Sequence, residues 1–363
     1  MKKIIFIHLL NDYSGSPKVL SQIVKNFKGF YDIELYTSKD NGFLSNLVQN
    51  HHTIFYKRFS NKFFTLFSYL ASQIDLFFKV LKYHQDKIIY INTLLPFGGA
   101  IAAKLRGLEV IYHIHETSIK PNILKKFLRF MVKTTASKVV FVSNDLASKE
   151  AFQNIPSFVI YNALEKQFLS TAFSSTYWHL YDGKFIVMMV CSLKDYKGVR
   201  EFIKLAKSLE EESRIAFRLI LNAEQEEIKS YFSEISIPKN TTILSKQNNL
   251  EVFYSKSSLV LNLSRVDQWV ETFGLTIIEA LAYGVPVIVP PVGGPTEIVE
   301  SDKEGYLISS YEVEEISKLI LELSANEEKC MLLSKNAREK AKQFSEELFL
   351  ESIKKVIDEN KHQ

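Results

Sequence analysis

Cysteine is scarce in this sequence, which limits the kinds of domain and site that it can form. The chain has 363 residues and only two cysteines, Cys191 and Cys330. Two cysteines cannot build a disulfide framework or a four-cysteine zinc site. Their scarcity favours a reducing compartment, while 46% apolar and 24% charged residues are typical of an ordinary globular protein.

Several motifs of common enzyme classes are also missing. The chain has no Walker A loop, no GxGxxG and no HExxH, which argues against a phosphate-loop ATPase, a dinucleotide dehydrogenase and a zinc protease. No set of cysteines and histidines has the spacing of metal ligands, and no DxD motif occurs. We therefore expect no cofactor and no essential divalent metal.

Long apolar runs are missing as well. No stretch reaches the roughly 20 apolar residues of a membrane-spanning helix, and the longest candidate, residues 63–81, contains Ser, Gln, Asp and Lys. It is predicted to form one or two amphipathic helices. The apolar start is interrupted by His8 and has no small-residue cleavage site, so it is interpreted as a buried strand rather than a signal peptide. We expect a cytoplasmic protein, peripheral at the inner face of the membrane.

Charge is divided unevenly along the chain. Residues 1–170 hold 22 basic and 11 acidic side chains, a balance of +11, whereas residues 171–363 have a balance of −7. This division suggests two halves with different partners. A basic half fits an anionic acceptor or membrane surface. Nucleic acid is not expected as a partner, because the sequence has no aromatic-basic RNA motif or recognition helix.

Short apolar runs alternate with helical patterns in two successive series, which predicts α/β halves with parallel sheets. A weakly patterned connection at 164–183 separates the series. Ligands of such sheets bind outside the carboxyl ends of the strands, so the loops after the strands are the places to seek chemistry. The predicted strands are 3–9, 33–36, 87–92, 109–114, 138–143 and 158–161, then 184–190, 217–221, 242–244, 258–263 and 285–289.

The densest group of candidate residues lies in 262–309. Glu271 precedes Thr272-Phe273-Gly274, and an apolar helix is predicted from about Leu275 to Tyr283, with Glu279 inside it. Backbone N–H groups at a helix start beside a glycine form an anion site, and a carboxylate further along can accept hydrogen bonds from a ribose diol. The alternative is that Glu271 is a helix cap and Glu279 a structural residue whose charge has a partner.

This pattern resembles the donor-site signature of retaining GT-B glycosyltransferases of family 4, the glycosyl transferases group 1 type. The similar residues are Glu271 and Glu279 with FGLT between them, then A-x-x-x-G-x-P-V-I, and Gly293-Gly294-Pro295. The resemblance implies a GT-B fold of two facing Rossmann-like α/β domains. It also implies an acceptor domain at 1–167, a nucleotide-sugar domain at 168–345 and a helix at 346–363 that returns to the first domain.

The first half carries two further sites by this resemblance. Gly15 and Ser16 stand where the family has a glycine-rich loop near the donor phosphate, although Ser16 replaces the usual second glycine; a plain tight turn is the alternative. His115, at the predicted end of a strand, would contact the donor sugar. His113 lies on the same strand face and is a rival, and either histidine could be structural.

In the second half, Lys197 matches the family's diphosphate-binding lysine, whereas Cys191-Ser192 replaces the usual Gly-Arg. Lys194 is the candidate for a second positive charge, and Ser192 can donate a hydrogen bond. The family's glycine-rich turn is also missing at 221–225. The resemblance thus implies His115, Glu271 and Lys197 as catalytic, with donor binding by Gly15, Ser16, Ser192, Lys194, Thr272, Phe273, Gly274, Leu275 and Glu279.

The function implied is transfer of a sugar from a nucleotide-sugar donor to a glycan or lipid-linked acceptor, in surface polysaccharide, lipopolysaccharide, capsule or glycolipid biosynthesis. The resemblance implies retention of configuration. Segments 56–67 and 120–138 combine basic and apolar residues, as membrane-surface segments do; helices packed on their own domain are the alternative. Competing functions are a catalytically inactive nucleotide-sugar-binding partner subunit and a GT-B-fold sugar-nucleotide epimerase.

Overall fold

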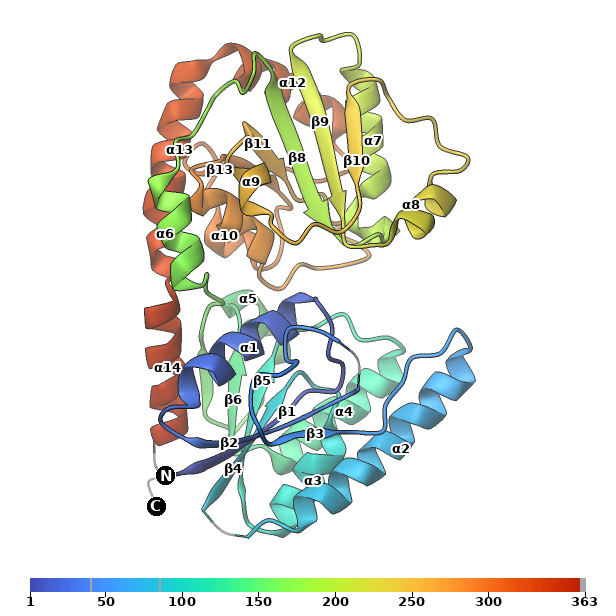
Figure 1. Cartoon of the computed structure of the whole chain (residues 1–363), viewed down its shortest axis with the longest axis vertical. Helices are drawn as coiled ribbons and strands as arrows, with labels where there is room; N and C mark the ends of the chain where they lie inside the picture. The colour runs from blue at the N-terminus through green and yellow to red at the C-terminus, as the bar shows by residue number, and fades with distance from the viewer. Residues whose placement is uncertain (40, 85, 360–363) are drawn as a thin grey trace. The chain divides into compact units, whose positions relative to one another are not determined.

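The computed structural model describes residues 1–39, 41–84 and 86–359, which form two compact units (Figure 1). Unit 1 combines Met1–Asn162 with the last helix from Glu346, and unit 2 is Ala163–Ser345. The units divide five residues before the expected position of 167/168, because α6 (Lys166–Ser174) belongs to unit 2. This helix lies in the segment 164–183 that the sequence indicates as a connection.

Unit 1 is built on a parallel sheet in the order β3-β2-β1-β4-β5-β6-β7. Its central strands are buried apolar runs, as expected where helices cover both faces of a sheet. The apolar start of the chain forms the central strand β1. The strands are β1 (Lys3–Ile7), β2 (Asp32–Thr37), β3 (His51–Thr53), β4 (Lys87–Asn92), β5 (Glu109–Ile114), β6 (Lys138–Phe141) and β7 (Ser157–Val159).

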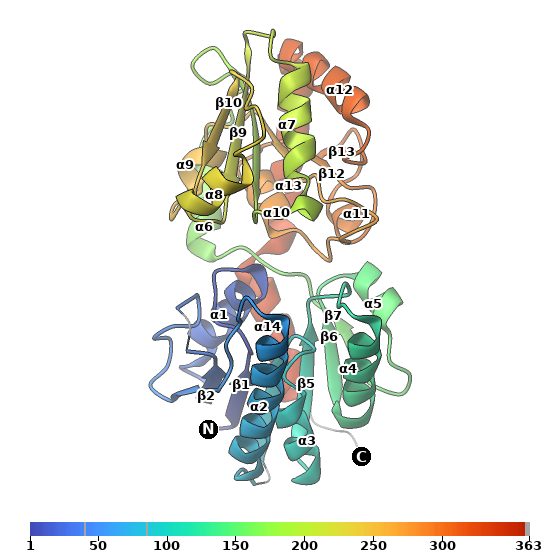
Figure 2. The same ribbon diagram turned by 90° about the vertical axis from the view of Figure 1, so that its right-hand side faces the viewer.

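Helices cover both faces of this sheet, with α1 and α14 in contact on one side and α2, α3 and α4 on the other (Figures 1 and 2). Helix α14 is tied to unit 1 by polar contacts at its carboxyl end. Lys138 Nζ donates to the Val356 carbonyl at 2.7 Å, and the Tyr31 hydroxyl donates to Asp358 at 2.9 Å. The helices are α1 (Gly15–Phe27), α2 (Lys62–Leu81), α3 (Phe97–Leu105), α4 (Asn122–Thr135), α5 (Asn144–Glu150) and α14 (Glu346–Asp358).

Unit 2 repeats the architecture with a parallel sheet in the order β10-β9-β8-β11-β12-β13. The strands are β8 (Phe185–Cys191), β9 (Ile215–Leu221), β10 (Thr241–Leu244), β11 (Leu259–Leu261), β12 (Val287–Val289) and β13 (Gly305–Leu307). With α6, the helices are α7 (Val199–Ser208), α8 (Gln225–Tyr231), α9 (Glu251–Tyr254), α10 (Leu275–Ala282), α11 (Pro295–Ile298), α12 (Val313–Ala325), α13 (Glu327–Ala341) and the short 3₁₀ turns η1 (Asp195–Lys197) and η2 (Lys342–Phe344).

Each sheet has one point at which the chain reverses its direction of winding. In unit 1 this point lies between β1 and β4, and in unit 2 it lies between β8 and β11. The loops leaving the carboxyl ends of such strand pairs diverge and leave room for a ligand. The residues after β1, β4, β8 and β11 are therefore placed where binding chemistry is expected in each unit.

Candidate active site

The loop after β8 in unit 2 depends on Gly198, which ends η1 with φ +80°. A Cβ at this position would lie 2.1 Å from the Leu263 carbonyl oxygen, beyond the end of β11. Only glycine allows this approach together with the left-handed backbone. The contact brings the loop carrying Lys197 against the segment that follows β11.

Lys197 and Glu271 form an ion pair in unit 2, with Nζ 2.6 Å from Oε2. Both side chains are largely buried, at 18% exposed each, and they lie 74 positions apart in the sequence. The Lys197 ammonium also lies 5.2 Å from the centre of the Trp269 ring, which stacks on Tyr196. The fold thus brings two of the predicted catalytic residues together and holds the lysine between a carboxylate and an aromatic face.

The loop of Glu271 is packed tightly against the glycine pair that follows β12. Gly294 N–H donates to the Glu271 carbonyl at 2.9 Å. A Cβ on Gly293 would lie 2.4 Å from that same carbonyl oxygen, and one on Gly294 would lie 2.3 Å from the Thr272 carbonyl oxygen. Two glycines are needed here because backbone packs directly on backbone. They fix the position of Glu271 and of Thr272-Phe273.

Helix α10 begins directly after this loop, at Leu275. Its N-terminal capping residue is Gly274 with φ +111°, a conformation that glycine adopts at low cost. Phe273 is buried and packs edge-on against Phe344, with ring centres 5.7 Å apart. The first N–H groups of α10, the electropositive end of the helix, therefore follow Glu271 at a defined place.

Glu279 is buried within α10, and its Oε2 accepts a hydrogen bond of 2.8 Å from the Tyr254 hydroxyl. Tyr254 is fully buried and stacks on Tyr283. A buried carboxylate requires such a partner. This contact supports the structural interpretation of Glu279 and leaves its binding of a ribose diol as a prediction.

Ser192 and Lys194 lie on the same loop as Lys197. The Lys194 N–H donates to the Ser192 carbonyl at 2.8 Å, and the Lys194 side chain is exposed. Burial raises the pKa of the neighbouring Cys191 thiol to about 12, so this cysteine is a neutral thiol at physiological pH. The structure therefore places Lys194 near the candidate site as an exposed cation rather than in the Lys197–Glu271 pair.

A buried ion pair that sequence reasoning missed supports this loop. Arg265 donates from Nε and Nη2 to Glu201 Oε1 at 3.1 and 2.8 Å. The Arg265 N–H also donates to the Tyr196 carbonyl at 2.8 Å. The arginine thereby links the segment after β11 to η1 and to α7. A glutamate on the buried face of α7, next to Phe202, is the sequence signal that could have indicated a buried partner.

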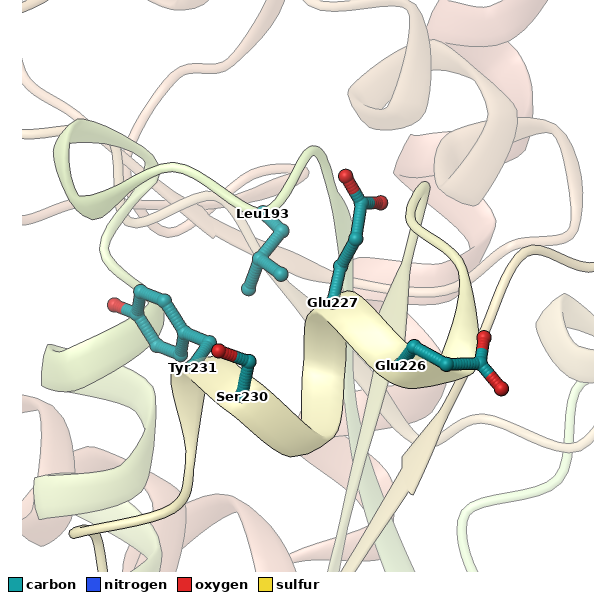
Figure 3. Close-up of a pocket in the computed structure, with 5 residues that line it drawn as sticks. All are labelled: Leu193, Glu226, Glu227, Ser230 and Tyr231. Atoms are coloured by element: carbon teal, nitrogen blue, oxygen red, sulfur yellow. The ribbon is translucent and has the colours of Figure 1, made fainter.

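An open pocket of about 540 Å³ borders the same loop (Figure 3). Leu193 comes from the loop after β8, and the other lining residues lie on α8: Glu226, Glu227, Ser230 and Tyr231. The two carboxylates suit hydroxyl or amino donors better than phosphate groups. The pocket follows the segment 221–225, where the family's glycine-rich turn is missing.

In unit 1 the predicted histidine is held by Asn92 at the end of β4. His115 Nε2 lies 2.8 Å from Asn92 Oδ1, and Asn92 Nδ2 donates to the Ser16 carbonyl at 3.1 Å. The second contact orients the amide, so His115 Nε2 is the donor to Oδ1. Gly15 begins α1 directly before Ser16. The structure thus brings the loop after β1 and His115 together through Asn92.

Burial keeps the histidines of this cluster uncharged. His8 belongs to the cluster because its Nδ1 lies 3.1 Å from Asn92 Nδ2. Burial lowers the pKa of His8 to about 4 and that of His113 to about 3, and it lowers the pKa of His115 well below its ordinary value. His113 is fully buried, contacts the Tyr90 hydroxyl at 2.9 Å and has its ring centre 4.2 Å from that of His115. His113 therefore has a packing role beneath His115, which favours His115 of the two rivals.

Glu116 completes the unit 1 cluster. Its carboxyl oxygens accept hydrogen bonds from the backbone N–H groups of Leu94 and His115, at 3.0 and 3.2 Å. Burial nevertheless raises the pKa of Glu116 to about 7. Within residues 1–39, 41–84 and 86–359, no group of three or more His, Cys, Asp or Glu side chains is arranged to hold a metal ion.

Comparison with known proteins agrees with this architecture. Residues 175–340 match the family described as glycosyl transferases group 1. A relative from Methanocaldococcus jannaschii, described as an uncharacterized glycosyltransferase, is 25% identical over 98% of both chains. HepE of Anabaena in complex with UDP-glucose has a TM-score of 0.80 at 19% identity, over 99% of this chain and 100% of that one. Sucrose-phosphate synthase of Thermosynechococcus elongatus has a TM-score of 0.78 at 15% identity, over 98% of each chain.

These findings define the class of protein. The two Rossmann-like units have the GT-B fold, and the chain is a glycosyltransferase. The glycosyl transferases group 1 match covers most of unit 2, the unit that holds the Lys197–Glu271 pair.

Proposed function

We propose that this glycosyltransferase transfers a sugar from a nucleotide diphosphate donor to a glycan or lipid-linked acceptor, with retention of configuration and without an essential metal. The observation that carries the proposal is the Lys197–Glu271 pair beside the start of α10. It combines a cation, a carboxylate and oriented N–H groups at the winding reversal of unit 2. The solved relative HepE, which binds UDP-glucose, supports the donor class.

The proposed chemistry breaks the bond between the anomeric carbon and the diphosphate oxygen, and the bonding electrons leave with the diphosphate. The acceptor hydroxyl oxygen forms the new bond, and its proton passes to the departing phosphate oxygen. Lys197 and the N–H groups at the start of α10 stabilise the growing negative charge. Glu271 faces the sugar, and Ser192 and Lys194 supply further hydrogen-bond donors to the diphosphate.

Glu279 is proposed to bind the ribose diol, and His115 to contact the transferred sugar. His115 is uncharged because of burial, so it acts as a neutral hydrogen-bonding group positioned by Asn92. The acceptor is proposed to bind unit 1, in surface polysaccharide or glycolipid biosynthesis, at the inner face of a membrane. The excess of basic residues in residues 1–170 supports this assignment.

The experiment that tests the proposal has two stages. A thermal-shift screen with UDP, GDP, ADP, CMP and dTDP identifies the nucleotide, because a ligand of the native state raises the melting temperature. The matching radiolabelled nucleotide sugar is then supplied with and without an acceptor mixture. Transfer or slow donor hydrolysis, unchanged by EDTA, is the expected result. Binding of nucleotides without any turnover would contradict enzymatic transfer.

Ser192 favours one alternative, a catalytically inactive nucleotide-sugar-binding subunit. The family's arginine is replaced there, and a lost cation weakens diphosphate stabilisation. The same two stages separate the functions, since the inactive subunit gives a thermal shift and no turnover. Ser192→Arg is a further test: it should tighten diphosphate binding if the site has only lost a cation, and it should disrupt binding if the pocket has repacked around Ser192.

A further inference from the structure

The outward face of α2 in unit 1 is apolar over its whole length. Its exposed residues recur at spacings of three and four, as one stripe of a helix does. Phe63 is 71% exposed, Phe67 65%, Ile74 60% and Phe78 65%, and Leu66 and Leu70 extend the stripe. The outward face of a surface helix in a globular protein is normally polar. Apolar area gathered in this way indicates an interaction surface.

The inward face of α2 is locked to α3. The Tyr69 hydroxyl donates to the Leu95 carbonyl at 2.8 Å, and Gly98 N–H donates to Gln73 Oε1 at 3.0 Å. A Cβ on Gly98 would lie 2.0 Å from the Gln73 carbonyl oxygen, so the two helix backbones are in direct contact. Helix α2 therefore cannot rotate to hide its outward stripe.

This packing also determines how α2 could meet a membrane. Among the described residues, it is the one helix long and apolar enough to cross a bilayer by length and composition. Its buried residues include Ser68, Ser72 and Gln73. Ser68 accepts from the Lys57 N–H and Gln73 from the Gly98 N–H, while Ser72 donates to the Tyr69 carbonyl within the helix. A helix held in this way lies along the surface of its unit, as interfacial helices do.

A second group of exposed apolar residues lies on α4, and aromatic contacts beneath the surface join α2 to α4 through α3. Phe97, the first residue of α3, has its ring centre 6.1 Å from that of Tyr69 on α2 and 5.0 Å from that of Phe127 on α4. Ile123 is 78% exposed, and Phe127 and Phe130 are also exposed. Figure 2 shows α2, α3 and α4 along one side of unit 1. The beginnings of these helices lie at the carboxyl edge of the sheet, the edge that carries His115.

The charge around this surface is mainly basic, and its nearest carboxylates are paired, Asp75 of α2 with Lys79 and Glu150 with Lys125 and Arg129. Residues 54–74 and 117–144 contain no Asp or Glu. The exposed basic residues are Lys57, Arg58 and Lys62 near the start of α2 and Lys120, Lys126 and Lys133 around α4. Two copies of such a surface would repel each other, whereas an anionic lipid surface attracts it. Phenylalanines within a basic rim match the chemistry of a phospholipid headgroup layer.

We propose that the outward stripe of α2, together with the start of α4, inserts into the interfacial layer of an anionic phospholipid bilayer. The basic rim attracts the protein to the anionic lipid surface. The inserted phenylalanines contribute the part of the binding that persists at high salt. The inference rests on the proposed function for its purpose, which is to present the carboxyl edge of unit 1 to a lipid-linked acceptor. The membrane contact itself uses the surface of α2 and α4, which is separate from the Lys197–Glu271 pair of the proposed chemistry.

Flotation with vesicles of phosphatidylglycerol and phosphatidylcholine tests the proposal on the full chain. The wild type is expected to float with anionic vesicles and to keep part of this binding at high salt. The double variant Phe67→Asp/Ile74→Asp is expected to lower the bound fraction about tenfold, because it places charge in the stripe. Lys126→Glu is expected to weaken binding only at low salt.

Leu332→Asp is the matched control, because it places a charge at an exposed apolar residue of α13 in unit 2; it is expected to float like the wild type. Hydrolysis of the nucleotide sugar in solution is expected to be unchanged in the α2 variant, which separates this test from that of the proposed function. Equal flotation of the α2 variant and the wild type would overturn the proposal. So would a wild-type dimer in solution that the α2 variant converts to monomers, since a second copy would then cover the stripe.

Discussion

At the scale of single residues, Lys197 is the group on which the proposed chemistry most depends. Ser192 stands where the resembled family usually has an arginine, and the exposed Lys194 lies outside the ion pair of Lys197 with Glu271. Lys197 is held in place by the carboxylate and by the Trp269 ring. A positioned charge of this kind acts on the leaving group without reorganising during the reaction.

Replacing Lys197 by alanine should therefore lower transfer strongly. Loss of one preorganised donor costs on the order of 3 kcal/mol in the transition state, or about a hundredfold in rate. The measurement is kcat/KM with the identified donor. Lys194→Ala is the control on the same loop and should have a smaller effect. Full activity of Lys197→Ala would show that the diphosphate does not bind this loop.

Glu279 and Glu271 should respond differently to substitution. Glu279→Gln keeps an acceptor for the buried Tyr254 hydroxyl but removes the charge, so the protein should stay folded and bind nucleotide diphosphate more weakly. Glu279→Ala leaves that hydroxyl unpaired, which should lower the free energy of unfolding by about 1–3 kcal/mol. Nucleotide titration and denaturant unfolding measure the two effects.

Glu271→Gln should instead lower transfer while leaving nucleotide affinity largely intact. Its carboxylate lies at the sugar end of the proposed donor, and the amide can still accept a hydrogen bond from Lys197. If both glutamates changed nucleotide affinity equally, the assignment of one to the ribose and the other to the sugar would be wrong.

At the scale of secondary-structure elements, the candidate site of unit 2 is made by loops that meet through glycine. Gly198 places η1 against the end of β11, and Gly293 and Gly294 place the Glu271 loop against the segment after β12. The strands contribute position and the loops contribute the functional groups, as in other open parallel sheets.

Gly198→Ala tests this arrangement. The new Cβ would have to avoid the Leu263 carbonyl oxygen and keep φ near +80°, so the loop carrying Lys197 should shift and transfer should fall. Gly183→Ala is the matched control, because Gly183 also has a positive φ, +73°, but a Cβ there would meet no atom within 4 Å beyond its chain neighbours. In that control, backbone strain should lower the free energy of unfolding by about 1 kcal/mol. Transfer should stay normal. Equal losses of transfer in both variants would argue against the packing explanation.

At the scale of the whole molecule, the stability of the protein should depend on pH through the buried groups of unit 1. The buried histidines of unit 1 stay neutral when folded, but in the unfolded chain they bind protons below their ordinary pKa of 6.5. Their contribution to the free energy of unfolding is complete above pH 6.5 and is lost as the pH falls. Glu116 acts in the opposite sense, because its pKa is raised from 4.5 to about 7 and it disfavours folding as the pH rises through that interval.

Three histidines outweigh one carboxyl group, so the free energy of unfolding should fall as the pH is lowered from 6.5 to 5, with roughly two protons taken up on unfolding. Denaturant unfolding at a series of pH values measures this slope. Glu116→Gln removes the opposing titration and should make the slope steeper. A stability that rose on acidification over this interval would contradict the assigned burial of the histidines.

The architecture could largely be predicted from the sequence, because long buried strands of parallel sheets are continuous apolar runs. The runs at 3–9, 87–92, 109–114 and 184–190 correspond to β1, β4, β5 and β8. The edge strands β3 and β13 were missed. Each has only three residues, and β3, with the sequence His-His-Thr, is a strand only because it pairs with β2.

The sequence by itself determined two α/β halves with parallel sheets and the loops in which chemistry should be sought, because apolar periodicity is a local property of the chain; the GT-B class was implied by the resemblance of the motifs in 262–309 to a known family. Tertiary structure alone decided that Lys197 meets Glu271 and that Asn92 orients His115. It also decided that Arg265, paired with Glu201, supports the loop after β8 that carries Lys197. These contacts join residues far apart in sequence, so they exist only after the parallel strands have aligned their carboxyl ends. The exposure of the α2 stripe was decided in the same way, because packing on α3 determines which side of an almost wholly apolar helix faces outward.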